Sequence, residues 1–269
     1  MNRAGAFLMF CLLPGFARAQ EAPGFQVDRL PALPGLLWDD TRVLVQAPGD
    51  WSGRQWTEVA LGAAAVVATG FALDHAVDQA VLRNPSPSLN NAAKNMAQLG
   101  GAGGLVLIGG GYLGSSLLGK DQARAMWVDA GIATVLARGT AFAAQMVVGR
   151  AVPSDNQGSS RFRPFSGDDS FPSGHASQAF AMASVIALHA DSPWVSAAAY
   201  GLAGLVGLAR LETRDHFSSD VLAGALIGTG IGRAVVRMDQ GRRLGTRAEI
   251  RFAPVLAPGF RGLSVMAKF

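Results

Sequence analysis

The sequence predicts an all-α protein, a membrane-embedded bundle of about six helices followed by a short C-terminal β-hairpin. Hydrophobic residues make up 49% of the 269 residues and charged residues only 16%, whereas charged residues are about 25% of an average soluble domain. Long stretches rich in Ala, Leu, Gly and Val lack strict alternation, which favours helices. The last segment alternates apolar and polar residues, which favours strands.

The N-terminus has the pattern of a secretory signal peptide over residues 1–19. Arg3 supplies the positive charge, an apolar stretch follows to Phe16, and Ala17-Arg-Ala19 fits a cleavage site. The alternative, an N-terminal membrane helix, is disfavoured because the stretch is short. The single cysteine, Cys11, lies in this segment, so we expect neither a disulfide nor thiol chemistry in the mature chain.

Four parts follow from the order of these patterns along the chain. After the signal, residues 20–53 form a lead-in segment, and residues 54–236 form the helical domain. Residues 237–269 form a basic tail with a possible hairpin whose turn is Ala257-Pro-Gly-Phe260. Within the domain, the expected helices cover about residues 59–73, 98–119, 127–149, 176–190, 192–209 and 221–232. Several are shorter than the roughly 20 residues of a spanning helix.

Two polar motifs interrupt the apolar domain. The first is Phe171-Pro-Ser-Gly-His-Ala-Ser177, which opens an apolar helix. The second is Arg210, five residues, His216, three residues and Asp220, which leads into another apolar helix. A helix N-terminus presents free N–H groups and a positive dipole end to an anion. Two imidazoles, a guanidinium and a carboxylate beside such termini therefore predict a phosphate site.

These motifs resemble the second and third signatures of the type 2 phosphatidic acid phosphatase (PAP2) and vanadium haloperoxidase superfamily, over roughly residues 55 to 235. The family's first signature is Lys, six residues and Arg-Pro. Here Gln145 stands in place of the lysine and Val152 in place of the arginine, while Pro153 is kept. Three nearby cations are candidates to replace the missing phosphate ligands: Arg150, Arg161 and Arg163.

The resemblance implies a role for each motif residue. His216 would attack phosphorus and form a phosphohistidine, with Asp220 as the partner that orients its imidazole. His175 would be the general acid that protonates the leaving oxygen. The phosphate would be bound by Arg210, Ser173 and Gly174. No cluster of Cys, His, Asp and Glu has metal-ligand spacing, so we expect a reaction without a metal or another cofactor.

The expected function is hydrolysis of a phosphate monoester or diphosphate, lipid-linked, at the periplasmic face of a bacterial inner membrane. One alternative is a vanadate-dependent haloperoxidase, and another is a catalytically weak or inactive protein that binds lipid phosphates. The net charge is +4. Because no run of Lys and Arg is interleaved with aromatic residues, this charge favours an anionic membrane or substrate over nucleic acid.

The orientation in the membrane presents a conflict. Six spans after a cleaved signal would place both motif loops in the cytoplasm and the basic tail outside, although basic tails prefer the inside. The conflict disappears if the first stretch, about 15 residues between Glu58 and Asp74, packs without spanning. The alternative is a soluble periplasmic protein. The tail arginines are Arg233, Arg237, Arg242, Arg243, Arg247 and Arg251.

Overall fold

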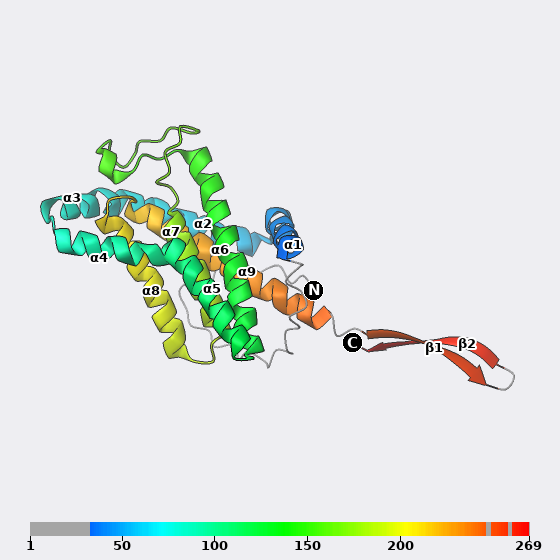
Figure 1. Cartoon of the computed structure of the whole chain (residues 1–269). Helices are drawn as coiled ribbons and strands as arrows, with labels where there is room; N and C mark the ends of the chain where they lie inside the picture. Colours follow the sequence, from blue (N-terminus) through cyan, green and yellow to red (C-terminus); the bar gives the residue numbers. More distant parts are fainter. Residues whose placement is uncertain (1–32, 246–248, 258–259, 269) are drawn as a thin grey trace.

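The computed structural model describes residues 33–245, 249–257 and 260–268, and the described part is mainly a bundle of helices (Figure 1). The predicted signal peptide lies outside these residues. The helices are α1 Leu33–Gln46, α2 Gly53–Thr69, α3 His75–Arg83, α4 Pro87–Ala97, α5 Ala102–Leu117, α6 Asp121–Val148, α7 Gly174–His189, α8 Pro193–Glu212 and α9 Ser218–Gly245. Each of the six predicted stretches overlaps a helical segment and differs from it only at the ends, which confirms the helical fold class.

Local sequence explains where the central helices begin and end. Ser52 caps α2 in a capping box with Gln55, in which each side chain bonds the other residue's backbone N–H. The end of α6 is set by Gly149, whose φ is +57°. A Cβ there would lie 1.8 Å from the carbonyl oxygen of Arg163. Only glycine therefore fits this close left-handed turn.

The first apolar stretch is longer than its composition suggested. A π-helical turn, Gly70–Asp74, joins α2 to α3, and the continuous segment Gly53–Arg83 is 31 residues long. At about 1.5 Å per residue it reaches roughly 46 Å, more than the roughly 30 Å hydrocarbon core. By length and composition this segment could therefore cross a membrane, and whether it does so stays untested. The charged residues Asp74 and Asp78 obscured its helical continuation in the sequence.

Four described helical segments are long and apolar enough to cross a membrane: Gly53–Arg83, Asp121–Val148, Pro193–Glu212 and Ser218–Gly241. A fifth crossing is possible if α4 and α5, bent by 49° at their junction, count as one broken span. Large apolar side chains are exposed on the first three of these segments and on α5, including Val67, Phe71, Val106, Leu113, Phe142 and Leu208. An apolar exterior of this kind suits a lipid environment.

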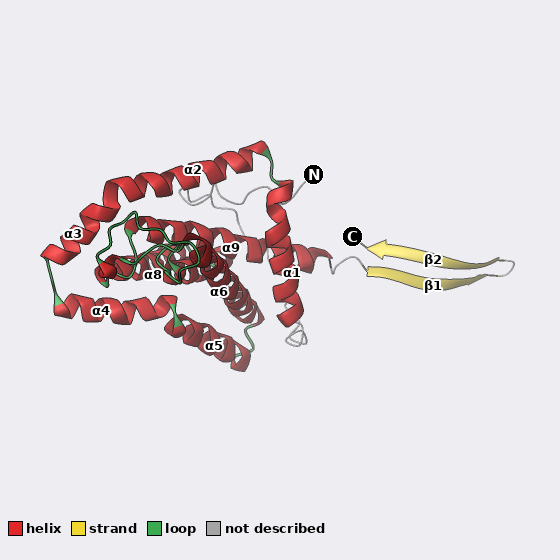
Figure 2. Cartoon of the chain, turned by 90° about the horizontal axis from the view of Figure 1, so that it is seen from above, coloured by secondary structure: helices red, strands yellow, loops and turns green. Residues whose placement is uncertain are grey.

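The interior is built from small residues around α7, which packs against α6, α8 and α9. Figure 2 shows α6, α8 and α9 together in the middle of the bundle. Glycines bring α9 close to α7. A Cβ at Gly224 would lie 2.4 Å from the carbonyl oxygen of Ser173, and one at Gly228 would lie 2.2 Å from that of Ser177. Small residues four apart allow such close helix contact. The start of α7, which carries the first polar motif, is thereby held against the start of α9.

The ends of the described chain add two features. The predicted lead-in segment contains α1, whose residues Leu33, Leu36, Leu37 and Leu44 pack against the main hydrophobic core. Near the C-terminus, β1 Glu249–Ala257 and β2 Phe260–Lys268 form an antiparallel hairpin. Its register runs from Glu249 opposite Lys268 to Ala257 opposite Phe260.

Candidate active site

The first polar motif forms the N-terminus of α7. Ser173 is the N-cap, and its fully buried Oγ accepts a hydrogen bond from the backbone N–H of Ala176 at 3.3 Å. The backbone N–H groups of Gly174 and His175 lie in the first helical turn, where no carbonyl of the helix can accept from them. This end of α7 is therefore able to bind an anion, and Ser173 contributes by setting the start of the helix.

His216 lies in the loop between α8 and α9 and is held in one tautomer. Its Nδ1 is 2.7 Å from the carbonyl oxygen of Ser170. Because a carbonyl can only accept, Nδ1 carries the proton, and the neutral ring has its lone pair on Nε2. Burial and the nearby charge of Arg210 lower the pKa of His216 to about 3. The imidazole is therefore neutral at ordinary pH, as a nucleophile requires.

The structure corrects the expected role of Asp220. Its carboxylate does not contact the imidazole of His216. Instead, Oδ2 accepts from the hydroxyl of Ser170 at 2.6 Å and from the backbone N–H of Phe217 at 2.7 Å. Asp220 is a positioning residue that holds Ser170, and the carbonyl of Ser170 orients the histidine. Spacing placed Asp220 near His216, but it could not reveal this intermediate residue.

Arg150 is a buried structural cation, which contradicts its expected role as a phosphate ligand. Its guanidinium donates to Asp74 Oδ2 at 2.7 Å and to Asp220 Oδ1 at 2.5 Å. It also donates to the hydroxyl of Ser219 at 2.8 Å, and its Cζ lies 4.3 Å from the ring centroid of Phe217. With two carboxylates already paired to it, Arg150 joins the turn Gly70–Asp74 and the start of α9 to the loop after α6.

The other two candidate replacement cations lie in the exposed loop between α6 and α7. Arg163 donates from Nε to Asp168 Oδ2 at 2.8 Å, and its side chain is 42% exposed. This pairing lowers the pKa of Asp168. Arg161 is also exposed. The loop geometry therefore gives no support to Arg161 or Arg163 as phosphate ligands, because one is paired and both face solvent.

Gln145 occupies the position of the missing lysine but has a different function. Its buried amide donates from Nε2 to the carbonyl oxygen of Asp169 at 2.7 Å and to that of Pro172 at 2.9 Å. The side chain thus ties the end of α6 to the segment that leads into the first motif. The two donors of the amide serve both acceptors without adding charge, whereas a lysine would place a cation there.

Arg210 and His175 complete the predicted cluster. Arg210, near the end of α8, contacts Asp215 with Nη2 at 3.1 Å from Oδ2, and its buried Nε has no partner among the described residues. Burial and the charge of Arg210 lower the pKa of His175 to about 4. The ring of His175 lies against the break before α5, since a Cβ at Gly101 would be 3.2 Å from its Nε2.

Sequence reasoning missed several residues that support this site. Asp74 accepts from the backbone N–H and the hydroxyl of Ser219, at 2.8 and 2.6 Å. Arg214 donates to Asp78 at 2.8 Å and to the carbonyl oxygen of Pro153 at 2.7 Å. These contacts join segments that are far apart in the chain. The only sequence signal was the presence of carboxylates at the edge of an apolar stretch.

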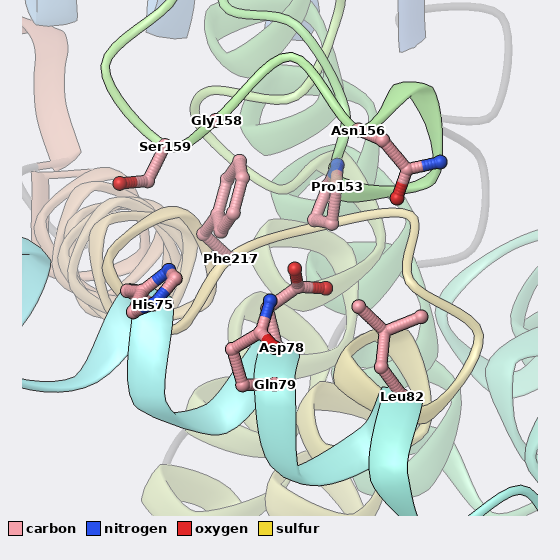
Figure 3. Close-up of a pocket in the computed structure, with 9 residues that line it drawn as sticks. All are labelled: His75, Asp78, Gln79, Leu82, Pro153, Asn156, Gly158, Ser159 and Phe217. Atoms are coloured by element: carbon pink, nitrogen blue, oxygen red, sulfur yellow. The ribbon is translucent and has the colours of Figure 1, made fainter.

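A separate cavity lies next to the site. It has a volume of about 230 Å³. One of its lining residues is Phe217, which directly follows His216 in the chain (Figure 3). Neither histidine of the motifs nor Arg210 lines it, so the cavity is not where phosphate would meet the nucleophile. Its lining consists of His75, Asp78, Gln79, Leu82, Pro153, Asn156, Gly158, Ser159 and Phe217.

Taken together, the geometry gathers two neutral imidazoles, the guanidinium of Arg210 and the N-terminus of α7 in one region of the bundle. Among the described residues, no group of three or more His, Cys, Asp or Glu side chains could hold a metal ion. Residues 127–244 match the family model of the PAP2 superfamily. This match confirms the resemblance inferred from the two motifs, and this part of the chain is a PAP2 region.

Individual proteins are also similar to parts of the chain. A lipid A 1-phosphatase of Porphyromonas gingivalis is 42% identical over 66 residues, which cover 24% of this chain and 15% of that protein. The structure of Aquifex aeolicus LpxE is 22% identical, with a TM-score of 0.46, covering 61% of this chain and 94% of the other. A Bacillus subtilis transmembrane PAP2 type phosphatidylglycerolphosphate phosphatase is 21% identical, with a TM-score of 0.43, covering 79% and 98%.

Proposed function

We propose that the protein is a membrane phosphatase that hydrolyses a lipid-linked phosphate monoester or diphosphate through a phosphohistidine intermediate. One observation carries the proposal. The proton of His216 is fixed on Nδ1 by the carbonyl of Ser170, which leaves the Nε2 lone pair free to attack. The match of residues 127–244 to the PAP2 superfamily supports the same class of activity.

The reaction would proceed in two displacements. In the first, Nε2 of His216 bonds to phosphorus as the bond to the leaving oxygen breaks, and a protonated His175 gives its proton to that oxygen. In the second, water attacks phosphorus, His175 takes a proton from the water, and the bond to His216 breaks. Arg210 and the N-terminus of α7 would stabilise the charge on the phosphoryl oxygens, the main source of catalysis in phosphoryl transfer.

A lipid-linked substrate fits the surroundings of the site. The candidate residues lie at the ends of apolar helices with outward-facing side chains, so a lipid could present its phosphate without leaving the membrane. The similarity to a lipid A 1-phosphatase covers a short segment, and it makes lipid A a first substrate to test. Phosphate release should be measured with lipid A, phosphatidic acid, phosphatidylglycerol phosphate and undecaprenyl diphosphate. If phosphate is released from none of these four lipids, the proposal is contradicted.

We place the site at the periplasmic face of the inner membrane, because the arginine-rich end of the chain favours the cytoplasm. Reporter fusions after Ser166 and after Ser218 should therefore give periplasmic signals. A fusion after Arg243 should give a cytoplasmic signal. Cytoplasmic signals at both motif loops would refute this orientation. Periplasmic signals at all three positions, with the protein in the soluble fraction, would instead support a secreted form.

When an anion binds in the site, the imidazole of His175 should take up a proton. Its pKa is about 4 in the empty site, and an anion beside it would raise that value by favouring the charged imidazole. Between the two values, affinity should therefore rise as the pH falls, by up to about tenfold per pH unit. Sulfate is a suitable probe because it stays a dianion between pH 5 and 8. Its affinity can be measured by calorimetry.

The matched variant for this measurement is His175→Gln, which keeps a polar side chain but cannot titrate. Its sulfate affinity should change little over the same pH range, while wild-type affinity should be highest at pH 5. An equally steep dependence in His175→Gln would assign the proton uptake to another group and remove the support for His175 as the general acid.

A further inference from the structure

We propose that Arg138 binds the substrate phosphate and supplies the cation that the first motif lacks. This inference rests on the proposed function, because it assigns a ligand within the same phosphate site. Arg138 belongs to none of the three motifs, and it lies in the middle of α6, a segment apolar enough to span a membrane. An ionisable residue in such a segment is expected to have a functional partner.

The guanidinium of Arg138 lies directly against the first polar motif. A Cβ added at Gly174 would lie 1.7 Å from Nη1 of Arg138 and 2.7 Å from its Cζ. The guanidinium therefore occupies the space that a side chain at Gly174 would take, at the first turn of α7. The glycine of the motif has a physical purpose here, since any larger residue would displace the arginine.

The charge of Arg138 is directed into the same cluster as the predicted site residues. Its positive charge acts on both His175 and His216 and favours their neutral forms. Arg210, near the end of α8, also acts on both histidines with its positive charge. Two guanidiniums, two imidazoles and a helix N-terminus form a strongly electropositive group. An anion is the ligand that such a group stabilises.

Arg138 has no counter-ion among the residues that the structure describes, where no ion pair or hydrogen bond is found for its side chain. Neighbouring arginines differ in this respect: Arg150 is paired with Asp74 and Asp220, and Arg163 with Asp168. Arg138 is half-buried, so it is partly removed from water. A half-buried cation without a protein anion is available to a ligand.

The location on α6 explains how Arg138 can replace the family's lysine. Gln145 occupies the lysine position, and Arg138 lies seven residues earlier. Seven residues are nearly two helical turns, so the two side chains leave the same face of α6, about 20° apart. Gln145 holds the loop before the motif through Asp169 and Pro172. The same face of α6 thus carries Gln145, which positions the loop, and Arg138, a cation that lies farther from this end of the helix.

The test is the affinity of the purified full-length protein for orthovanadate and inorganic phosphate. Arg138→Gln should weaken both by roughly 10- to 100-fold, as expected for loss of a charge-assisted hydrogen bond. Arg138→Lys should recover part of the affinity because it keeps the charge but loses the fork. The matched control is Arg163→Gln, which removes an equal charge from a neighbouring loop and should leave the affinity unchanged. The unfolding temperature of each variant is measured in parallel.

A double-mutant cycle with Gly174→Ala makes the test independent of folding. The added methyl group should displace Arg138, so Gly174→Ala should weaken anion binding in the wild type. It should have much less effect when Arg138 is already Gln, because the contact is gone. Additive effects, or unchanged affinity in Arg138→Gln, would overturn the proposal. A lower unfolding temperature with unchanged affinity would show a purely structural role and would also overturn it.

The outcomes separate this proposal from the proposed function. If the wild type hydrolyses lipid phosphates but Arg138→Gln binds vanadate normally, only the assignment of Arg138 fails. If the wild type binds vanadate, loses this binding in Arg138→Gln and hydrolyses none of the tested lipids, only the hydrolytic function fails. A wild type that binds neither vanadate nor phosphate would contradict both.

Discussion

Replacing His216 with Gln should abolish turnover while leaving the fold intact. Glutamine keeps a neutral, polar side chain of similar length in the loop between α8 and α9. The amide nitrogen of glutamine has no lone pair able to attack phosphorus. Removal of a covalent nucleophile reduces kcat by a factor on the order of 10⁶ in a well-studied hydrolase, and we expect a loss of this size. Phosphate release from the substrate found by the lipid screen is the measurement.

The matched control is His75→Gln, which replaces an exposed histidine that lines the adjacent cavity. It should retain wild-type kcat, because His75 does not reach the phosphate site. Unfolding temperatures of both variants should equal that of the wild type. If His216→Gln keeps substantial turnover, His216 is not the nucleophile. If His75→Gln loses turnover instead, the catalytic centre lies at the cavity.

Replacing Arg150 with Met should cause the largest loss of stability. Asp74 and Asp220 have side chains with no exposed surface, and Arg150 is paired with both. Without the cation, two buried carboxylates face each other uncompensated. Breaking a buried pair costs about 3–5 kcal/mol, and here two pairs break at once. Thermal unfolding in detergent should therefore show a clearly lower transition temperature, with loss of activity as Ser170 is released.

Two further variants separate the structural role of Arg150 from a role in binding. Arg163→Met removes a half-exposed cation and should leave the unfolding temperature nearly unchanged, since exposed pairs contribute little. Adding Asp74→Asn to Arg150→Met should restore part of the stability by removing one uncompensated charge. Wild-type stability in Arg150→Met, combined with weaker phosphate binding, would show that Arg150 is a ligand after all.

The helices could be predicted because their apolar stretches are long. Both the small residues of the interior and the large residues of the outer surface are apolar, so these helices are apolar along most of their length. The link between α2 and α3 could not be predicted, since Asp74 interrupts the apolar pattern. In the structure that same residue pairs with Arg150 and Ser219. A carboxylate whose partners lie about 75 or more positions away in the chain carries no local sequence signal.

The site was only partly predictable for the same reason. Motif spacing pointed to His175, Arg210 and His216, because those residues lie at or next to the ends of helices that the sequence defines. It assigned Asp220 directly to His216, whereas the structure places Ser170 between them. It also favoured cations near the missing motif, and so overlooked Arg138. Which arginine reaches the start of α7 depends on how α6 packs against it, and only the three-dimensional structure shows that.

The most direct test of the central claim is to trap the intermediate. Purified wild-type protein is incubated with a substrate carrying a labelled phosphate, quenched with base and analysed for label on the protein. We predict an acid-labile, base-stable phosphoryl group located at His216 and absent from His216→Gln. Turnover without any labelled protein, or label that persists in His216→Gln, would contradict a phosphohistidine mechanism at this site.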